Sequence, residues 1–386
     1  MQDMPAALDQ IKTYCHSLGF DLVGFTRPAK YTSFSIFAHW IEAGYHADMQ
    51  YLASAQSLRL RQSPLVLMPT CQSIIVLAYR YPGDILPTQE SQHGNPSIAA
   101  YARGRDYHNF LPPRMEQIKA YIQSLFVKPV TALCYTDTAP ILEKELGVRA
   151  GLGWIGKNTC LINPFIGSYF FLSEILLDVD LLGKRGDEYQ LPDRCGTCHR
   201  CIDICPTHCI KDDRTLDASN CIAYLTIENK GAIPFSAREQ VGNHLFGCDL
   251  CQQVCPWNKN TGELIADLPE KQEVLDHLEI ATYQQISGNE EFNHYFNKTP
   301  IKRANRRGFY RNLAVVLGNS LAKNTYSILE KLLQDTDALV RQHAAWALGK
   351  HLSPESLPLL RTALSQETDK KVIKEIELAL HRKEAQ

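Results

Sequence analysis

The hydrophobic positions of the first 190 residues alternate between helix-like and strand-like segments. Apolar residues recur at i, i+3 and i+4 over residues 6–18 and 114–126, which predicts two amphipathic helices. Short apolar runs at 73–79 and around 169–177 predict strands, and another strand is expected at 130–135. This alternation predicts an α/β domain over residues 1–190. The polar stretch 182–193, with its glycines and proline, predicts the domain boundary.

The pattern changes to repeated helices in the C-terminal part of the chain, residues 261–386. NLAVVLG at 312–318 aligns with HAAWALG at 343–349, and the same offset leads on into VIKEIELAL at 372–380. Helical units of this kind stack because none can bury its apolar face alone. We therefore expect an all-α domain of HEAT-like repeats. An ordinary helical bundle is the alternative, because the third copy is weak.

Composition and charge exclude several classes of protein. Of the 386 residues, 45% are hydrophobic and 21% charged, so the chain can bury a core. The formal net charge of −2 excludes a globally basic nucleic-acid binder but leaves room for a local basic patch. No apolar run approaches the roughly 18 residues of a membrane helix, and the start MQDMPAALDQ does not resemble a signal peptide. We expect a soluble, cytoplasmic protein, and a monomer, because no long hydrophobic stripe demands a partner.

Cysteine is unevenly distributed along the chain. Of 13 cysteines, nine lie between Cys195 and Cys255. Cytoplasmic thiols are kept reduced, so this crowding favours metal or cluster ligation over disulfides. Cys195, Cys198, Cys201 and Cys205-Pro206 match the C-x2-C-x2-C-x3-C-P run of bacterial ferredoxins, in which the fourth cysteine ligates the other cluster. A second run, Cys248, Cys251 and Cys255-Pro256, lacks one member, which Cys221 can supply.

This spacing predicts a ferredoxin-like segment with two [4Fe-4S] clusters over residues 191–260. One cluster takes Cys195, Cys198, Cys201 and Cys255, and the other takes Cys205, Cys221, Cys248 and Cys251. Structural zinc is the alternative, since paired CxxC units also form zinc ribbons, but zinc does not explain a proline after the last cysteine of both runs. Cys209 is left as a buried bystander thiol. The chain is therefore expected to move electrons one at a time.

The glycine-rich segment 151–158 resembles two nucleotide-binding motifs. It reads Gly151-Leu-Gly153-Trp-Ile-Gly156-Lys157-Asn158. Both motifs need a strand before them and a helix after them, whereas the preceding residues ILEKELGVRAG are charged and helix-patterned. Asn158 also offers no hydroxyl for magnesium. We reject both nucleotide readings, although the glycines still allow close approach of the backbone to another large cofactor.

Asp137 lies after the expected strand 130–135 and before a helix expected to begin near Pro140. It can serve as the N-cap of that helix. Alternatively, it can act as a general acid at the end of a strand that faces a pocket. The segment YARGRDYH at 101–108 gathers aromatic, basic and acidic groups, which in isolation is more typical of a surface loop than of a site.

Several long motifs together resemble the epoxyqueuosine reductase family over nearly the whole chain. They are YARGRDYH, DTAPILEKELGVRAGLGWIGKNT, RCGTCHRCIDICPT, NCIAYLTIENKG and FGCDLCQQVCPWN. The resemblance implies a cytoplasmic, cobalamin-dependent iron–sulfur enzyme that performs the last step of queuosine synthesis. Such enzymes remove the epoxide oxygen from epoxyqueuosine at the wobble position of the tRNAs for aspartate, asparagine, histidine and tyrosine. The resemblance also implies that Asp137 is the family's proton-donating aspartate.

The implied reaction suits the residues that the sequence provides. Deoxygenating an epoxide to an alkene needs two electrons and protons, and clusters can deliver the electrons singly to cobalt. Asp137 in a secluded pocket could protonate the resulting alkoxide. The resemblance implies base-off cobalamin without a protein axial ligand, and the chain has no D-x-H-x-x-G motif. Candidates for contacts with the cofactor are Arg59, Arg61, Tyr101, Gly153 and Lys157.

A basic run opens the repeat region and predicts a tRNA-binding surface. Lys302, Arg303, Arg306, Arg307 and Arg311 occur with no acidic residue between Pro300 and Arg311. Such charges could follow a phosphate backbone, and selectivity would come from fitting the modified base into the cobalamin pocket. Two other functions compete with this one. A corrinoid reductive dehalogenase generally carries a twin-arginine leader, which is not seen here, and a non-catalytic electron-transfer protein would not bind cobalt. The electron donor is not evident from the sequence.

Overall fold

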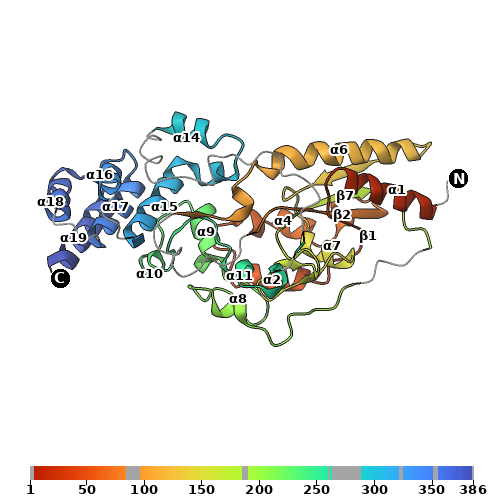
Figure 1. The fold of residues 1–386 in the computed structure, drawn as a ribbon, viewed down its shortest axis with the longest axis horizontal. Helices are drawn as coiled ribbons and strands as arrows, with labels where there is room; N and C mark the ends of the chain where they lie inside the picture. Colours follow the sequence, from red (N-terminus) through yellow and green to blue (C-terminus); the bar gives the residue numbers. More distant parts are fainter. Residues whose placement is uncertain are drawn as a thin grey trace. The chain divides into compact units, whose positions relative to one another are not determined.

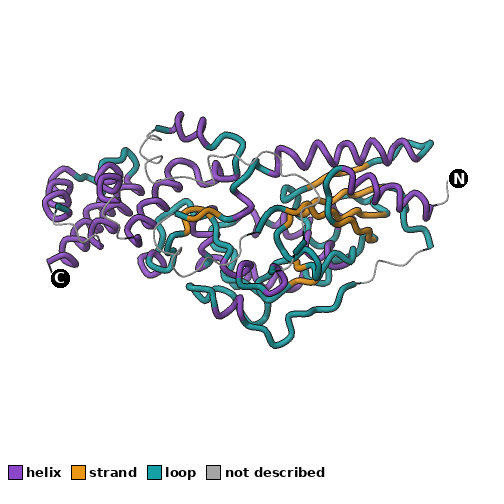
Figure 2. The backbone as a smooth tube through the Cα atoms, in the orientation of Figure 1, coloured by secondary structure: helices purple, strands orange, loops and turns teal. Residues whose placement is uncertain are grey.

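The computed structural model describes residues 4–83, 96–184, 190–259, 261–262, 288–320, 325–350 and 355–384 (Figures 1 and 2). The chain forms two compact units. The first comprises Met1–Ile85, Arg105–Ser219 and Leu250–Glu270, and the second comprises Leu86–Gly104, Asn220–Asp249 and Lys271–Gln386. The predicted boundaries at 190 and 260 do not coincide with these units, because residues 220–249 pack with the C-terminal helices.

A four-stranded antiparallel sheet forms the centre of the first unit. Its order is β1 (Leu22–Thr26), β2 (Ser73–Arg80), β7 (Phe170–Leu177) and β4 (Ala132–Tyr135). Every residue of β2 is buried, as its continuous apolar run requires of a strand covered on both faces. The strands predicted at 73–79, 130–135 and 169–177 are confirmed.

Helices cover both faces of this sheet. On one face, Ile74 and Val76 of β2 pack in a core with Leu146 of α7 (Glu143–Arg149). On the other face, Tyr79 contacts Phe110 of α6 (Tyr107–Leu125), with ring centroids 5.2 Å apart. The remaining helices of this part are α1 (Met4–Ser17), α2 (Phe34–Glu42), α3 (Gln50–Ala53), α4 (Ala55–Leu60) and α5 (Pro64–Leu67).

The helix predicted at 114–126 begins earlier, at Tyr107. The Asp106 side chain caps it by accepting a hydrogen bond from the amide of His108. Pro112 and Pro113 lie inside this helix. The predicted helix began only at residue 114, after these prolines, because prolines ordinarily mark the beginning or the interruption of a helix.

The cysteine loops of the first unit are held by short elements. A two-stranded hairpin pairs β5 (Trp154–Ile155) with β6 (Leu161–Ile162). Cys201 lies within α8 (Arg200–Asp203), Cys251 lies within α11 (Leu250–Gln253), and Cys255 precedes the 3-10 helix η4 (Pro256–Asn258). Further along the chain, the short 3-10 helix η3 spans Ala218–Asn220.

The second unit combines a small parallel sheet with stacked helices. β3 (Ser97–Ile98) pairs with β8 (His244–Phe246), and the same unit contains η2 (Ala100–Ala102), α9 (Ile222–Ile227) and α10 (Phe235–Arg238). The C-terminal elements are α14 (Asn289–Tyr295), η5 (Pro300–Ala304), α15 (Asn305–Ser320), α16 (Tyr326–Leu333), α17 (Ala338–Lys350), α18 (Ser356–Gln366) and α19 (Lys370–Glu384). No described helix is long and apolar enough to cross a membrane.

The helical repeat follows the predicted alignment. A Cβ placed on Gly318 of α15 would lie 2.7 Å from the Cβ of Ala347 in α17, and one on Gly349 would lie 2.7 Å from that of Ala379 in α19. The glycine that ends each repeat motif therefore permits close approach of the next helix. The predicted all-α, HEAT-like arrangement is confirmed.

Candidate functional site

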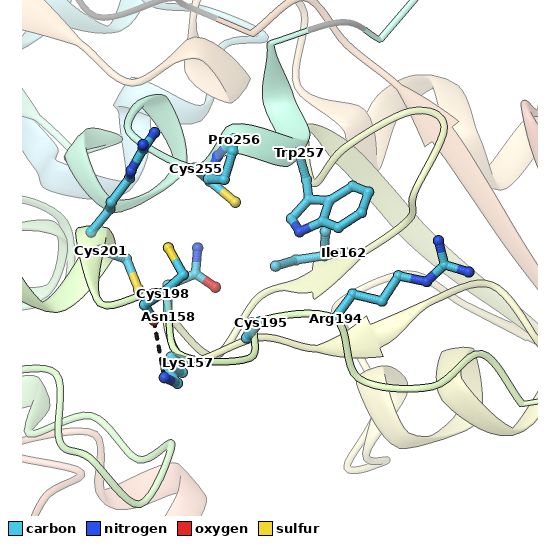
Figure 3. A pocket seen from close by; sticks show the side chains of 11 residues that line it. Lys157, Asn158, Ile162, Arg194, Cys195, Cys198, Cys201, Cys255, Pro256 and Trp257 are labelled. Atoms are coloured by element: carbon cyan, nitrogen blue, oxygen red, sulfur yellow. Dashed lines mark hydrogen bonds between the residues drawn. The ribbon is translucent and has the colours of Figure 1, made fainter.

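Four predicted cluster ligands line one cavity of about 280 Å³ in the first unit. They are Cys195, Cys198, Cys201 and Cys255, and Figure 3 shows them with the other lining side chains. Within the described residues, no three His, Cys, Asp or Glu side chains converge closely enough to hold a single metal ion. The four thiols line one shared space, as the predicted ligands of a single [4Fe-4S] cluster would.

One wall of this cavity is apolar. Trp154 and Trp257 meet edge to face with ring centroids 5.2 Å apart, and Ile162, Cys195 and Cys255 pack in the same cluster of side chains. Burial raises the pKa of the Cys255 thiol to about 11. An ionised sulfur in this setting needs a positive partner, which the iron of a cluster supplies.

The rejected nucleotide motif has a structural role beside the cavity. The Lys157 ammonium donates hydrogen bonds to the carbonyls of Gly196 (2.9 Å) and Cys198 (3.0 Å), and the Asn158 amide donates to the carbonyl of Cys251 (3.3 Å). A Cβ on Gly153 would lie 2.2 Å from the carbonyl oxygen of Ile162, so the hairpin itself requires that glycine. These contacts fasten the cysteine loops, while contact of Lys157 and Gly153 with cobalamin stays a prediction.

The second predicted set of ligands is divided between the units. Cys205 and Cys251 belong to the first, and Cys221 and Cys248 belong to the second. Cys209 is buried, as predicted, but its sulfur lies 3.4 Å from that of Cys205, and this hydrogen bond lowers the pKa of Cys205 to about 4. Cys209 therefore contacts a predicted ligand. The assignment of the second cluster stays a prediction.

Asp137 lies in the loop between β4 and α7. Its carboxylate oxygen Oδ2 accepts a hydrogen bond from the Tyr107 hydroxyl at 2.5 Å, and its backbone amide donates to Glu143 Oε1 at 2.7 Å. The N-cap role is wrong, because Leu142 occupies that position of α7. Asp137 is also exposed in this structure, whereas the reaction chemistry had suggested a secluded pocket. Its φ of +55° lies in the left-handed region, which few residues other than glycine adopt.

Two residues near Asp137 escaped the sequence analysis. Tyr107 belongs to YARGRDYH, which had seemed more typical of a surface loop. Glu174 lies within the apolar strand β7, where it is fully buried and where no described residue donates a hydrogen bond to its carboxylate oxygens. Burial and the nearby Glu143 and Asp137 raise the pKa of Glu174 well above its ordinary value. A single acid inside an apolar strand was the only signal that the sequence offered.

The remaining cobalamin candidates lie in different elements. Arg59 is exposed on α4, and Arg61 follows α4, donates to the Ser57 hydroxyl and lies over the Phe37 ring at 5.5 Å. Tyr101 belongs to the second unit, where its ring centroid lies 6.3 Å from that of Phe246. Contact of these residues with cobalamin stays a prediction.

The predicted basic run is only partly available to a polyanion. Arg311 is wholly buried, and its guanidinium donates to the carbonyls of Asn229, Gly231 and Leu225, each at 2.7 Å. The prediction that Arg311 contacts tRNA is therefore wrong, because this cation holds α15 against α9 and the segment that follows it.

Two other arginines of the run have acidic partners from later in the chain. Arg306 forms a two-pronged ion pair with Asp335, at 3.2 and 2.5 Å. Arg307 lies 3.5 Å from Asp337 but keeps 55% of its side chain exposed. Lys302 is exposed and Arg303 is half-buried. Lys302, Arg303 and Arg307 thus remain the best candidates for phosphate contacts.

Comparisons with known proteins agree with this architecture. Three family models match: "4Fe-4S double cluster binding domain" over residues 194–258, "Epoxyqueuosine reductase QueG, DUF1730" over 61–138 and "HEAT repeats" over 303–381. The epoxyqueuosine reductase of Pseudomonas aeruginosa is 41% identical over 357 residues, which cover 90% of this chain and 95% of that protein. The chain belongs to the epoxyqueuosine reductase family. The Escherichia coli member is 32% identical over 390 residues, which cover 98% of both chains.

Solved structures of epoxyqueuosine reductases share the fold over almost the full length. One of them, in complex with an epoxyqueuosine-modified stem loop of tyrosine tRNA, has a TM-score of 0.87 and 26% identity, and the match covers 99% of this chain and 100% of that chain. The Bacillus subtilis enzyme, also 26% identical, has a TM-score of 0.85 over 98% of this chain and 100% of its own. That structure is described as having its catalytic aspartate loop swung out of the active site.

Proposed function

We propose that this protein reduces epoxyqueuosine to queuosine at the wobble position of tRNA, with cobalamin and two [4Fe-4S] clusters as cofactors. The observation that carries the proposal is the setting of Asp137 in a chain of this family. Its carboxylate stands exposed at the end of β4 and is oriented by the Tyr107 hydroxyl at 2.5 Å. The crystallised relative in complex with an epoxyqueuosine-modified stem loop supports the choice of substrate.

The reaction fixes what the residues must supply. Converting the epoxide to an alkene consumes two electrons and two protons and releases one water. Bound clusters would pass on single electrons from an external reductant, and bound cobalamin would supply the chemistry that breaks the carbon–oxygen bonds. Asp137 would protonate the epoxide oxygen as its bond to carbon opens, while the Tyr107 hydroxyl holds the carboxyl group in place.

The surroundings of Asp137 fit a large, partly apolar cofactor. Helix α2 contains Phe34, Ile36, Phe37, Trp40 and Ile41, yet none of its residues is buried, and 55% of Ile36 is exposed. Arg61 lies over the Phe37 ring and is near enough to Glu143 for the two charges to affect each other. Arg61 would therefore hold the polar periphery of cobalamin beside the apolar side chains of α2.

The clusters would be held by the eight cysteines assigned from spacing. The cavity lined by Cys195, Cys198, Cys201 and Cys255 supports the first cluster. The match of residues 194–258 to a double-cluster family supports both. Lys302, Arg303 and Arg307 would bind phosphates of the substrate tRNA. The substrates would be the tRNAs for aspartate, asparagine, histidine and tyrosine.

Cobalamin-dependent turnover tests this proposal. Anaerobically reconstituted protein with a reductant would be incubated with epoxyqueuosine-containing tRNA, with and without cobalamin, and the nucleosides analysed by mass. We expect a product lighter by one oxygen only when cobalamin is present. A protein with intact clusters and bound cobalamin that forms no product would contradict the reaction. Product formation without cobalamin would contradict the proposed requirement for this cofactor. Failure of the protein to bind cobalamin would favour the alternative function of an electron-transfer protein.

A further inference from the structure

Two acidic side chains lie beneath the loop that carries Asp137, and the reaction as described does not use them. Glu143 occupies the first turn of α7, and Glu174 lies in the neighbouring strand β7. Glu143 Oε1 accepts the Asp137 amide at 2.7 Å, and Glu174 is 0% exposed. This arrangement indicates that Glu143 holds the loop through its hydrogen bond, whereas Glu174 packs beside it as an uncharged acid.

Glu174 has no means of stabilising a negative charge. Among the described residues, no donor lies within hydrogen-bond geometry of its oxygens, and the acids Glu143 and Asp137 that lie near it both raise its pKa. An isolated buried carboxylate is very costly, so such a group keeps its proton. Glu174 is therefore a protonated, uncharged acid in β7 near Asp137 and Glu143.

Glu143 differs from Glu174 because its carboxylate accepts a hydrogen bond from a backbone amide. The Asp137 amide points at its carboxylate, and a hydrogen bond to an ionised acceptor is roughly twice as strong as one to a neutral acceptor. Asp137 also adopts a φ of +55°, a conformation that persists only where the surroundings hold it. Loss of charge on Glu143 therefore weakens the contact that holds Asp137 in place.

The charges around Glu143 place its titration near neutral pH. Burial and the nearby Asp137 raise the pKa of Glu143 to about 7, although Lys144 and Arg61 favour its ionised form. Glu174 lies near it on β7, and the charge of Glu143 raises the pKa of Glu174. The fraction of ionised Glu143 thus changes over the physiological range.

We infer that Glu143 is a positioning residue that fastens the Asp137 loop when ionised and releases it when protonated, with neutral Glu174 supporting it from below. The inference rests on the proposed function, in which Asp137 is the proton donor. It predicts that protonation of Glu143 lowers turnover without changing cofactor content.

The first test compares wild type with Glu143→Gln at a series of pH values. The glutamine oxygen still accepts the Asp137 amide but cannot ionise. At pH 8 we expect wild-type kcat to exceed that of the variant several-fold, and the ratio to approach one at pH 6, where wild-type Glu143 is largely protonated. Taking the ratio removes the pH effects that are common to both proteins. Glu116→Gln, at an exposed glutamate of α6, is the control, with a ratio to wild type that stays near one between pH 6 and pH 8.

A second readout is independent of turnover. Hydrogen exchange of the amides at 136–142 would be compared at each pH between wild type and Glu143→Gln, with the amides of α1 as the internal reference. We expect faster exchange in the variant at pH 8 and equal exchange at pH 6. A kcat ratio and an exchange difference that both stay constant with pH would overturn the inference while leaving the proposed function intact. If wild type forms no queuosine, the proposed function itself fails, and the exchange data alone decide whether Glu143 holds the loop.

Discussion

At the scale of the residue, Asp137 owes its position to side chains from two other elements. Tyr107 reaches its carboxylate from the first turn of α6, and Glu143 accepts its backbone amide from α7. The sequence indicated Asp137 because it follows a strand and because the surrounding motif resembles that of a known family. It could not show that Tyr107 and Glu174 lie near Asp137, because that proximity depends on tertiary contacts that no local pattern contains.

Glu174→Gln should remove a destabilising effect that grows with pH. The folded-state pKa of Glu174 is raised above its unfolded value, so its contribution to stability is full below the unfolded pKa and is lost as pH rises towards the folded one. The Tm of the variant minus that of wild type should therefore increase between pH 5 and pH 9. Thermal unfolding of both proteins in parallel measures this difference. A difference that stayed constant or shrank would show that Glu174 is ionised and stabilised in the fold.

Lys157→Met should make the first cluster labile. The ammonium of Lys157 ties the carbonyls of Gly196 and Cys198, which belong to the loop that carries three ligands. We expect the cluster absorbance to decay several-fold faster in air than in wild type, with cobalamin affinity unchanged. Lys128→Met, which alters an exposed lysine, is the control. Weaker cobalamin binding with a stable cluster would instead support the cobalamin contact predicted from the sequence.

At the scale of the element, the strands and repeats follow from local pattern, whereas the role of Arg311 does not. The apolar run of β2 predicts a buried strand, and the glycines that end NLAVVLG and HAAWALG mark close packing of helices. Arg311 looked like part of a basic surface because its neighbours in sequence are basic. Its helical position turns it inward, where the carbonyls of residues 225–231 satisfy it.

Arg311→Met should therefore destabilise the protein rather than weaken tRNA binding specifically. The change leaves three carbonyls without their donor, those of Leu225 and Asn229 in buried hydrogen bonds, and disrupting such a network costs about 3–5 kcal/mol. We expect Tm to fall by several degrees, whereas Arg307→Met, on the exposed face, should leave it within about 2 °C. Calorimetry of the two variants makes the comparison. Equal Tm values for the two variants would contradict a buried structural role for Arg311.

At the scale of the whole molecule, the sequence predicted three segments by composition, but packing forms two units. Asn312 of α15 donates to the carbonyls of Thr226 and Leu245, so residues 220–249 pack with the repeats rather than with the other cysteine loops. Contacts between segments so distant in sequence have no local signature. The cysteine spacing was informative because cluster ligation depends on short intervals along the chain.

The exposed cations at the start of the repeats should contribute to tRNA affinity through charge. We expect Lys302→Ala combined with Arg307→Ala to weaken binding and to reduce the slope of log K against log salt by about 1–2, since each phosphate contact contributes about 0.7–0.9. Lys119→Ala combined with Lys128→Ala removes the same charge from the first unit and is the control. A salt titration of binding gives both slopes. Equal slopes for the two double variants would reject the basic run as the tRNA contact.

The role of Asp137 as proton donor is the central claim, and single turnover of Asp137→Asn tests it most directly. The asparagine keeps the shape of the side chain but carries no proton to give. With clusters, cobalamin and tRNA bound as in wild type, we expect queuosine formation to slow at least 100-fold, as loss of a general acid does. Queuosine formation at the wild-type rate would contradict it.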